Sequence, residues 1–331
     1  MAEFVTLEAP RYEALHRDLL RETHAIWHEG LGADAYARYN IVQSRTPWGA
    51  AHLRRVALVD AGAVLASAKW YDFAARLDGQ PIRILGIGAV FTPESQRGHG
   101  HAPALMARMM AEAEREGYQV AALFSEIGAP YYERLGFTVI ERETLTLDVI
   151  QKKGAPATLV RAGNETDLSR LEELHDIGDA FARFSPRRTA DLINFAVQKR
   201  RTRSALAPLG ARTTEFYVAE EGNHAVAYVL VTRGPGGNLA DQAETMWLEA
   251  CGDRDTTGAR VGAILQVLLA RTPSETPPPL YAWLPDGWLP PQVRIASRAP
   301  ADDILMVKPL GTFTFAPLHG REVTWWHADH F

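Results

Sequence analysis

Residues 85–102 read LGIGAVFTPESQRGHGHA, which is an apolar strand followed by a glycine-rich loop and the start of a helix. Pro93 opens the turn, and Gly98 and Gly100 lack the Cβ atoms that would keep a ligand away from the main chain. At the start of the helix, free backbone N–H groups and the helix dipole favour an anion. Phosphate is the anion we expect, and Arg97 can add a charge-assisted contact to it.

The loop differs from two common nucleotide-binding loops. It has no GxxxxGK[ST] sequence, as a P-loop would, and no GxGxxG with a following acid, as a dinucleotide-binding fold would. A glycine-rich turn alone also fits an ordinary strand-to-helix connection. Its interpretation therefore depends on the segments that follow it.

A second motif lies further along the chain. Residues 121–124 form an apolar strand, and residues 129–137 read APYYERLGF. Together with the R-x-x-G-x-A pattern of residues 97–102, this block resembles the two sequence motifs of the GNAT superfamily of N-acetyltransferases. The resemblance covers residues 1–150. It implies an α/β fold with a mixed, mostly antiparallel sheet and helices on both faces.

The same resemblance implies acetyl-CoA as co-substrate and direct attack of an amine on its thioester. A backbone N–H near Val90 would stabilise the oxyanion, and Tyr132 occupies the family's general-acid position. The residues implied to hold the cofactor are Ala89, Val90, Phe91, Arg97, Gly98, His99, Gly100, His101, Ala102 and Ser125. We expect a small-molecule amine as acceptor, and the acidic composition favours a cationic one. The alternatives are a protein N-terminus or lysine as acceptor, or a non-catalytic acyl-CoA sensor.

The general base has four candidates. Glu126 follows the strand beside the cofactor, and His28 and Glu29 end the first long helix, close to where the family binds acceptors. The fourth is the carboxylate of Phe331. It is suggested by a more distant resemblance to acetyltransferases of the enhanced-intracellular-survival type, in which tandem GNAT-like halves bring a C-terminal carboxylate to the active site. This chain is shorter than those proteins.

The second half repeats the order of strands and helices of the first. A polar segment at residues 151–156 predicts a linker, so we expect a catalytic domain at 1–150 and a degenerate GNAT-like copy at 157–331. Asp253 and Asp255 lie in the copy's loop where phosphates would bind, and like charge there predicts a single cofactor per chain. The aromatic tail, residues 312–331, predicts an ordered hairpin.

Charge and composition bear on nucleic-acid binding, disulfides, membrane spans and localisation. The net charge of -5 gives no general attraction to nucleic acid, and the basic run at residues 199–203 is interpreted as a solvated helix end. The single cysteine, Cys251, predicts a buried apolar side chain rather than a disulfide. No segment approaches the roughly 20 apolar residues of a membrane span, and residues 1–11 do not resemble a signal peptide. We therefore expect a cytoplasmic protein without a metal site.

Overall fold

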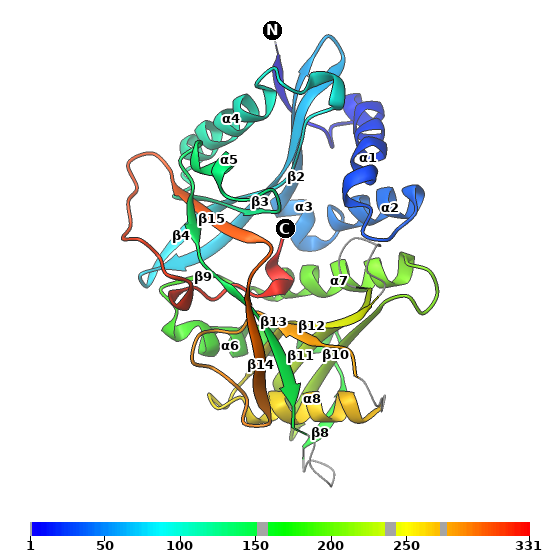
Figure 1. The fold of residues 1–331 in the computed structure, drawn as a ribbon, viewed down its shortest axis with the longest axis vertical. Coiled ribbons are helices and arrows are strands. Elements are labelled where there is room, and N and C mark those ends of the chain that lie inside the picture. The colour runs from blue at the N-terminus through cyan, green and yellow to red at the C-terminus, as the bar shows by residue number, and fades with distance from the viewer. Residues whose placement is uncertain (1, 151–157, 236–242, 272–276) are drawn as a thin grey trace. The chain divides into compact units, whose positions relative to one another are not determined.

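The computed structural model describes residues 2–150, 158–235, 243–271 and 277–331. Contacts between residues divide the chain into two compact units. The first comprises Met1–Glu141, Asp302–His319 and Phe331, and the second comprises Arg142–Ala301 and Gly320–His330. Each unit is built around its own mixed sheet (Figure 1).

The sheet of the first unit has the strand order β1-β2-β3-β4-β5-β15-β6. The strands are β1 (Glu3–Thr6), β2 (Leu53–Asp60), β3 (Ala63–Leu77), β4 (Gln80–Phe91), β5 (Val120–Ser125), β15 (Ile304–Pro309) and β6 (Thr138–Ile140). Only the β4–β5 pair on this path is parallel, and the other pairs are antiparallel. The expected mixed, mostly antiparallel sheet is therefore confirmed.

Helices cover both faces of this sheet (Figure 1). They are α1 (Glu13–Trp27), α2 (Ala33–Gln43), α3 (Pro47–His52), α4 (His101–Arg115) and α5 (Pro130–Glu133). Successive side chains of a strand point to opposite faces, and β2 shows the consequence. Leu58 packs in a core with Met106 of α4, whereas its neighbour Val59 packs in a second core with Leu19 of α1.

The second unit has the strand order β14-β7-β13-β12-β11-β10-β8. Its strands are β7 (Glu143–Val149), β8 (Leu159–Ala162), β10 (Thr213–Glu221), β11 (His224–Pro235), β12 (Glu244–Asp253), β13 (Leu280–Ala282) and β14 (Val293–Pro300), and the short β9 spans Phe184–Pro186. Its helices include α6 (Leu168–Gly178), α7 (Ala190–Leu206) and α8 (Ala259–Arg271). As β4 and β5 flank α4 in the first unit, the parallel strands β12 and β13 flank α8 here.

The boundaries of the two units along the sequence differ from those of the expected domains, 1–150 and 157–331. The expected domain 1–150 includes β7, but this strand pairs with β13 and β14 in the second sheet. In its place β15 inserts between β5 and β6. Residues 304–307 read ILMV, and such a continuous apolar run suits a strand covered on both faces.

Two local predictions were wrong. Residues 312–331 contain no strand but short 3-10 turns, η5 (Gly320–Glu322) and η6 (His327–Asp329), so the predicted hairpin is absent from this fully described segment. The basic run is not a solvated helix end, because Arg200 is only 5% exposed and pairs with the buried Glu249 at 2.9 Å.

The remaining predictions concern Cys251 and membrane spans. Cys251 is buried, as predicted, and burial raises the pKa of its thiol well above the usual value. Within the described ranges, no helix combines the length and apolar character that crossing a bilayer requires.

Candidate active site

Near its end, β4 has an irregularity in its ladder with β3 and no longer pairs with β5. Towards β3, Gly88 pairs with Lys69 and Phe91 with Ser67, so Ala89 and Val90 together oppose one residue. Ala89 has a φ of 47°, a left-handed conformation that marks a β-bulge. Towards β5, the ladder ends at Ile87. The bulge thus directs main-chain groups out of the sheet where β4 and β5 separate.

The glycine-rich loop joins this bulge to α4. Gly98 and Gly100 have φ values of 80° and 78°, and a Cβ at either position would meet nothing within 4 Å. Glycine is therefore favoured at these positions because the backbone is left-handed, and not because a side chain would be crowded. Gly100 is the N-cap of α4, and no acidic residue lies in the helix's first turn. Its N–H groups are suited to an anion, as the sequence predicted.

Of the other predicted cofactor residues, Ser125 belongs to β5 and not to this loop. Ser125 ends β5, and its hydroxyl donates a 2.7 Å hydrogen bond to the carbonyl oxygen of Gly128. The rings of His99 and His101 lie beside one another, with centroids 5.9 Å apart, and Arg97 is exposed.

Tyr132 lies in the core that α4 forms with the sheet. It is 8% exposed and shares this core with Val90 of the bulge. Burial, with smaller contributions from Tyr131 and Glu126, raises the pKa of its phenol to about 12. Within the described residues its hydroxyl has no hydrogen-bond partner. The group therefore keeps its proton at neutral pH and can give it to a ligand.

Glu126 lies just beyond the end of β5. Its carboxylate accepts a 3.4 Å hydrogen bond from Nε1 of Trp27, whose ring packs against Phe91 with centroids 6.4 Å apart. Partial burial and the nearby charges of Asp303 and Glu29 raise the pKa of Glu126. A carboxylate with a raised pKa is a stronger proton acceptor than an ordinary one.

The other acceptor-side candidates end α1. His28 is the C-cap of this helix, and its Nδ1 accepts a 3.0 Å hydrogen bond from the main-chain N–H of Gly30. Glu29 is exposed and has a φ of 55°. Both residues therefore shape the turn into α2, and Glu29 adds negative charge near Glu126.

Phe331 packs against two glycines of β4. A Cβ on Gly86 would lie 3.1 Å from its ring, and a Cβ on Gly88 would lie 3.0 Å from its carboxyl carbon. The ring also contacts Tyr71 and Phe73, with centroids 5.1 and 5.2 Å away. The main-chain carbonyl group of Phe331 thus lies one residue from the bulge. Sequence reasoning did not predict the aromatic lining, although two glycines on one face of a strand can mark such a close approach.

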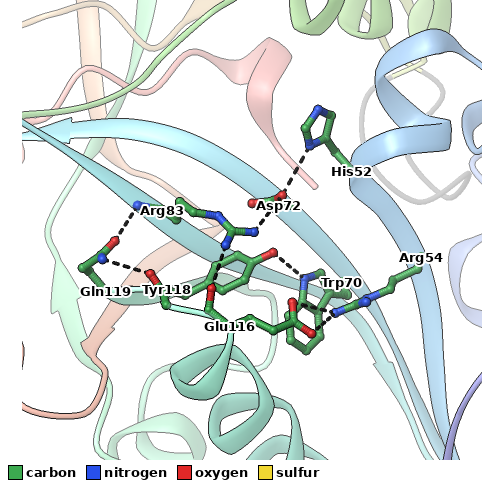
Figure 2. Close-up of polar contacts among 9 residues, drawn as sticks. His52, Arg54, Trp70, Asp72, Arg83, Glu116, Tyr118 and Gln119 are labelled. Atoms are coloured by element: carbon green, nitrogen blue, oxygen red, sulfur yellow. Dashed lines mark hydrogen bonds and ion pairs between the residues drawn. The ribbon is translucent and has the colours of Figure 1, made fainter.

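A polar network fixes the opposite end of the β4–β5 pair (Figure 2). The Arg83 side chain pairs with Asp72 at 3.1 Å, donates to the Glu116 carbonyl oxygen at 2.8 Å and lies over the Tyr118 ring. The main-chain N–H of Arg83 donates to the Gln119 side chain at 2.7 Å. These contacts hold the start of β5 against β4, at the end of the pair away from the point where the two strands separate.

In the corresponding loop of the second unit, an aspartate side chain occupies the helix start. The Asp253 carboxylate accepts hydrogen bonds from the main-chain N–H groups of Asp255, Arg260 and Val261, at 2.9 to 3.2 Å. The start of α8 is therefore already satisfied by a side chain, whereas the start of α4 is not. Of these two helix starts, only that of α4 is therefore open to an anion, and a single cofactor per chain stays a prediction.

Comparison with known proteins bears on the first unit. Residues 12–140 match the model of the acetyltransferase (GNAT) domain family. These residues form a GNAT acetyltransferase domain. The family predicted from the two sequence motifs is confirmed, and the matched segment contains the bulge, the glycine-rich loop and Tyr132. No curated protein matches the chain.

Solved structures extend the likeness in fold beyond the GNAT domain. A conserved Enterococcus faecalis V583 protein of unknown function, a probable N-acyltransferase, has a TM-score of 0.66 at 12% identity, over 94% of this chain and 73% of that one. A GCN5-related N-acetyltransferase from Kribbella flavida has a TM-score of 0.61 at 16% identity, over 93% and 72%. Saccharomyces cerevisiae N-myristoyltransferase with bound myristoyl-CoA has a TM-score of 0.54 at 11% identity, over 96% and 84%. The GNAT fold supports acyl transfer from an acyl-CoA.

Proposed function

We propose that the protein transfers an acetyl group from acetyl-CoA to a primary amine of a small molecule. The observation that carries this proposal is the continuous path from the β4 bulge through the glycine-rich loop to the uncapped start of α4. A pyrophosphate at the helix start would leave the thioester to reach the bulge. We assign the cofactor site to residues 89–91 and 97–102, with Ser125 at the end of β5.

The reaction requires three proton and charge events. An amine with a pKa of about 10.4 must lose a proton, which costs about 4.6 kcal/mol at pH 7. Its nitrogen then bonds to the thioester carbon, and the N–H of Val90 stabilises the oxyanion. Finally the C–S bond breaks, Tyr132 gives its proton to the thiolate, and the extra proton on the new amide nitrogen passes to Tyr132 and restores the phenol. Tyr132 is protonated at neutral pH, as its raised pKa requires, so a proton is present when the thiolate forms.

The proton acceptor in this proposal is Glu126 or the carboxyl group of Phe331. Glu126 has the raised pKa, and Phe331 has the position next to the bulge. Two variants distinguish them: Glu126→Gln, and a Gly-Ser extension that turns the Phe331 carboxyl group into an amide. The variant that removes the true acceptor lowers kcat at least tenfold, and the other leaves kcat within about threefold of wild type.

The test of the function is acetyl-CoA-dependent release of free thiol with a panel of polyamines, aminoglycosides, amino acids and short peptides. We expect turnover of one class of small amine and a loss of about 10²-fold in kcat for Tyr132→Phe. Tyr131→Phe is the matched control, since Tyr131 is the adjacent, less buried phenol, and it should stay near wild type. Acetyl-CoA affinity should be unchanged in both variants.

The same assay separates the alternatives. Turnover confined to peptides would favour a protein acceptor. Binding of acetyl-CoA without turnover of any amine would favour the sensor. Because one neighbour in fold binds myristoyl-CoA, a second series with myristoyl-CoA tests chain length. Faster turnover with the long chain would overturn the acetyl assignment while keeping acyl transfer. Failure to bind either acyl-CoA would exclude the proposed cofactor site.

A further inference from the structure

The second unit contains a cavity of its own, with a volume of about 170 Å³. It lies where β12 and β13 have separated, since their ladder ends at Leu248 and Ala282. The end of β12, the segment after β13 and the C-terminal turn of α6 line it, among other segments. The lining residues that matter here are His175, Asp179, Phe181, Asp286, Trp288 and Trp326.

Aromatic rings at different angles surround this space. The rings of Trp288 and Trp326 are perpendicular, with centroids 6.5 Å apart, and His175 lies 6.4 Å from Trp326 at 66°. At the rim, Phe181 is 89% exposed. An exposed aromatic side chain beside a cavity lined by further rings offers several π faces to one ligand, an arrangement suited to an organic cation.

The charges around the cavity also favour a cation. Asp179, Asp253 and Asp286 line it, against Arg321 as the one lysine or arginine among the lining residues. Arg188 neutralises Asp179, but Asp286 is exposed and forms no ion pair with another described residue. His175 adds no positive charge at neutral pH, because burial lowers its pKa well below the usual value.

Among the residues that line the cavity, Trp326 has a buried hydrogen-bond donor without an acceptor in the described part of the chain. Nε1 of Trp326 lies in a side chain that is only 5% exposed, and it has no hydrogen-bond partner among the described residues. A buried unpaired N–H is costly, so a ligand with a hydrogen-bond acceptor would relieve the cost. The volume corresponds to roughly ten water-sized spheres, which is enough for a ligand of about that many heavy atoms.

We propose that this cavity binds a small ring-bearing amine, held as an ammonium ion near Asp286, with its ring against Phe181 and Trp288 and an oxygen accepting from Trp326. This site belongs to the second unit alone. The proposal is independent of the acyl transfer assigned to the first unit, and each can fail without the other.

Three matched probes test the chemistry of the ligand: 2-amino-1-phenylethanol, 1-phenylethane-1,2-diol, which replaces the amine by a hydroxyl, and phenethylamine, which lacks the hydroxyl. Binding is measured by calorimetry on the full chain without acyl-CoA, at pH 7. We expect the amino alcohol to bind most tightly and each analogue at least fivefold more weakly. A diol that binds as well as the amino alcohol would overturn the cation assignment, and no binding of any probe would overturn the site.

Variants locate the binding. Gly178 lines the cavity without a positive φ, and a Cβ there would meet nothing within 4 Å. Gly178→Leu therefore adds a bulky apolar side chain to the cavity lining without backbone strain and should weaken binding at least fivefold. Phe181→Ala and Asp286→Asn should each weaken it at least fivefold. Unchanged affinity in all three variants would place the probe elsewhere and overturn the proposal.

Each rim variant has a matched control in the same unit. Leu209 is a fully exposed apolar residue away from the cavity, and Asp191 is an exposed acid in the first turn of α7. Leu209→Ala and Asp191→Asn should bind like wild type. If Gly178→Leu does not fold, which its thermal melting curve reveals, the comparison of Phe181→Ala with Leu209→Ala decides the question.

Discussion

At the scale of single residues, burial shifts the pKa of several side chains away from the value usual for their residue type. Tyr132 and His175 are both held in their neutral forms, one in the proposed catalytic core and one beside the second cavity. In the proposed mechanism, the burial that raises the pKa of the phenol would also exclude water from the place where the thiolate leaves. The burial of His175 instead affects how stability depends on pH.

Stability should fall as the pH drops below about 6.5. The folded state holds His175 neutral, with a pKa well below that of the unfolded chain, so acid protonates the unfolded chain first. Each such group contributes at most about 1.4 kcal/mol per pH unit. We expect His175→Gln to lose less stability than wild type between pH 7.5 and 5.5 in urea unfolding. His224→Gln, at an exposed histidine, should behave like wild type, and equal slopes for all three proteins would contradict the assignment.

Gly88→Ala should disturb the position of Phe331. The new Cβ would lie 3.0 Å from its carboxyl carbon, so one group must shift. We expect a loss of kcat of at least fivefold with little change in acetyl-CoA affinity, measured by steady-state kinetics and calorimetry. Gly32→Ala is the control, because its Cβ meets nothing and its φ is negative. A wild-type kcat in Gly88→Ala would show that the close approach has no part in turnover.

At the scale of elements, the strand–loop–helix unit of β4 and α4 depends on backbone conformation. Gly100→Ala places a side chain at a φ of 78°, which costs roughly 1–2 kcal/mol. We expect at least tenfold weaker acetyl-CoA binding in calorimetry, because the loop gives up this conformation. Gly210→Ala in the second unit has a similar φ of 77° and open space. It should cost similar stability and leave acetyl-CoA affinity unchanged, whereas an equal loss of affinity would implicate general destabilisation.

The motifs that make this unit were readable in the sequence because their residues are local. Residues 97–102 and 129–137 specify a turn, a helix start and a buried tyrosine within a few positions each. The insertion of β15 was not readable, because its apolar run would suit any central strand. The approach of Phe331 to Gly88 joins residues far apart in the chain, and no local spacing encodes it. Asp253 is an intermediate case. Its charge could be read from the sequence as unfavourable for phosphate, but its hydrogen bonds to the start of α8 could not be predicted.

At the scale of the whole molecule, the second unit interrupts a hairpin of the first. β15 is antiparallel to β6, with Leu305 opposite Ile140. Residues 142–301 thus leave and rejoin the first unit at neighbouring positions. The first sheet is complete only when a strand from the far side of this insertion has been added.

Cutting the chain at the boundary suggested by the sequence should therefore fail. Residues 1–150 lack β15, so β5 would expose an unpaired apolar edge and the fragment should aggregate. Joining Glu141 to Asp302 by a short glycine-rich turn, in a chain that ends at His319, closes the β6–β15 hairpin and should restore a folded first unit. Circular dichroism and acetyl-CoA binding provide the measurements. A well-folded fragment 1–150 that binds acetyl-CoA would contradict this topology.

The interrupted hairpin also sets the order of events during synthesis. The ribosome makes roughly 180 residues between the end of β5 and the start of β15, which takes about 10–40 s at typical elongation rates. For that interval the nascent first unit has a gap beside β5 and needs protection from aggregation. Premature termination within residues 142–301 would leave the glycine-rich loop in a sheet that lacks β15, so the arrangement would couple the proposed activity to completed translation.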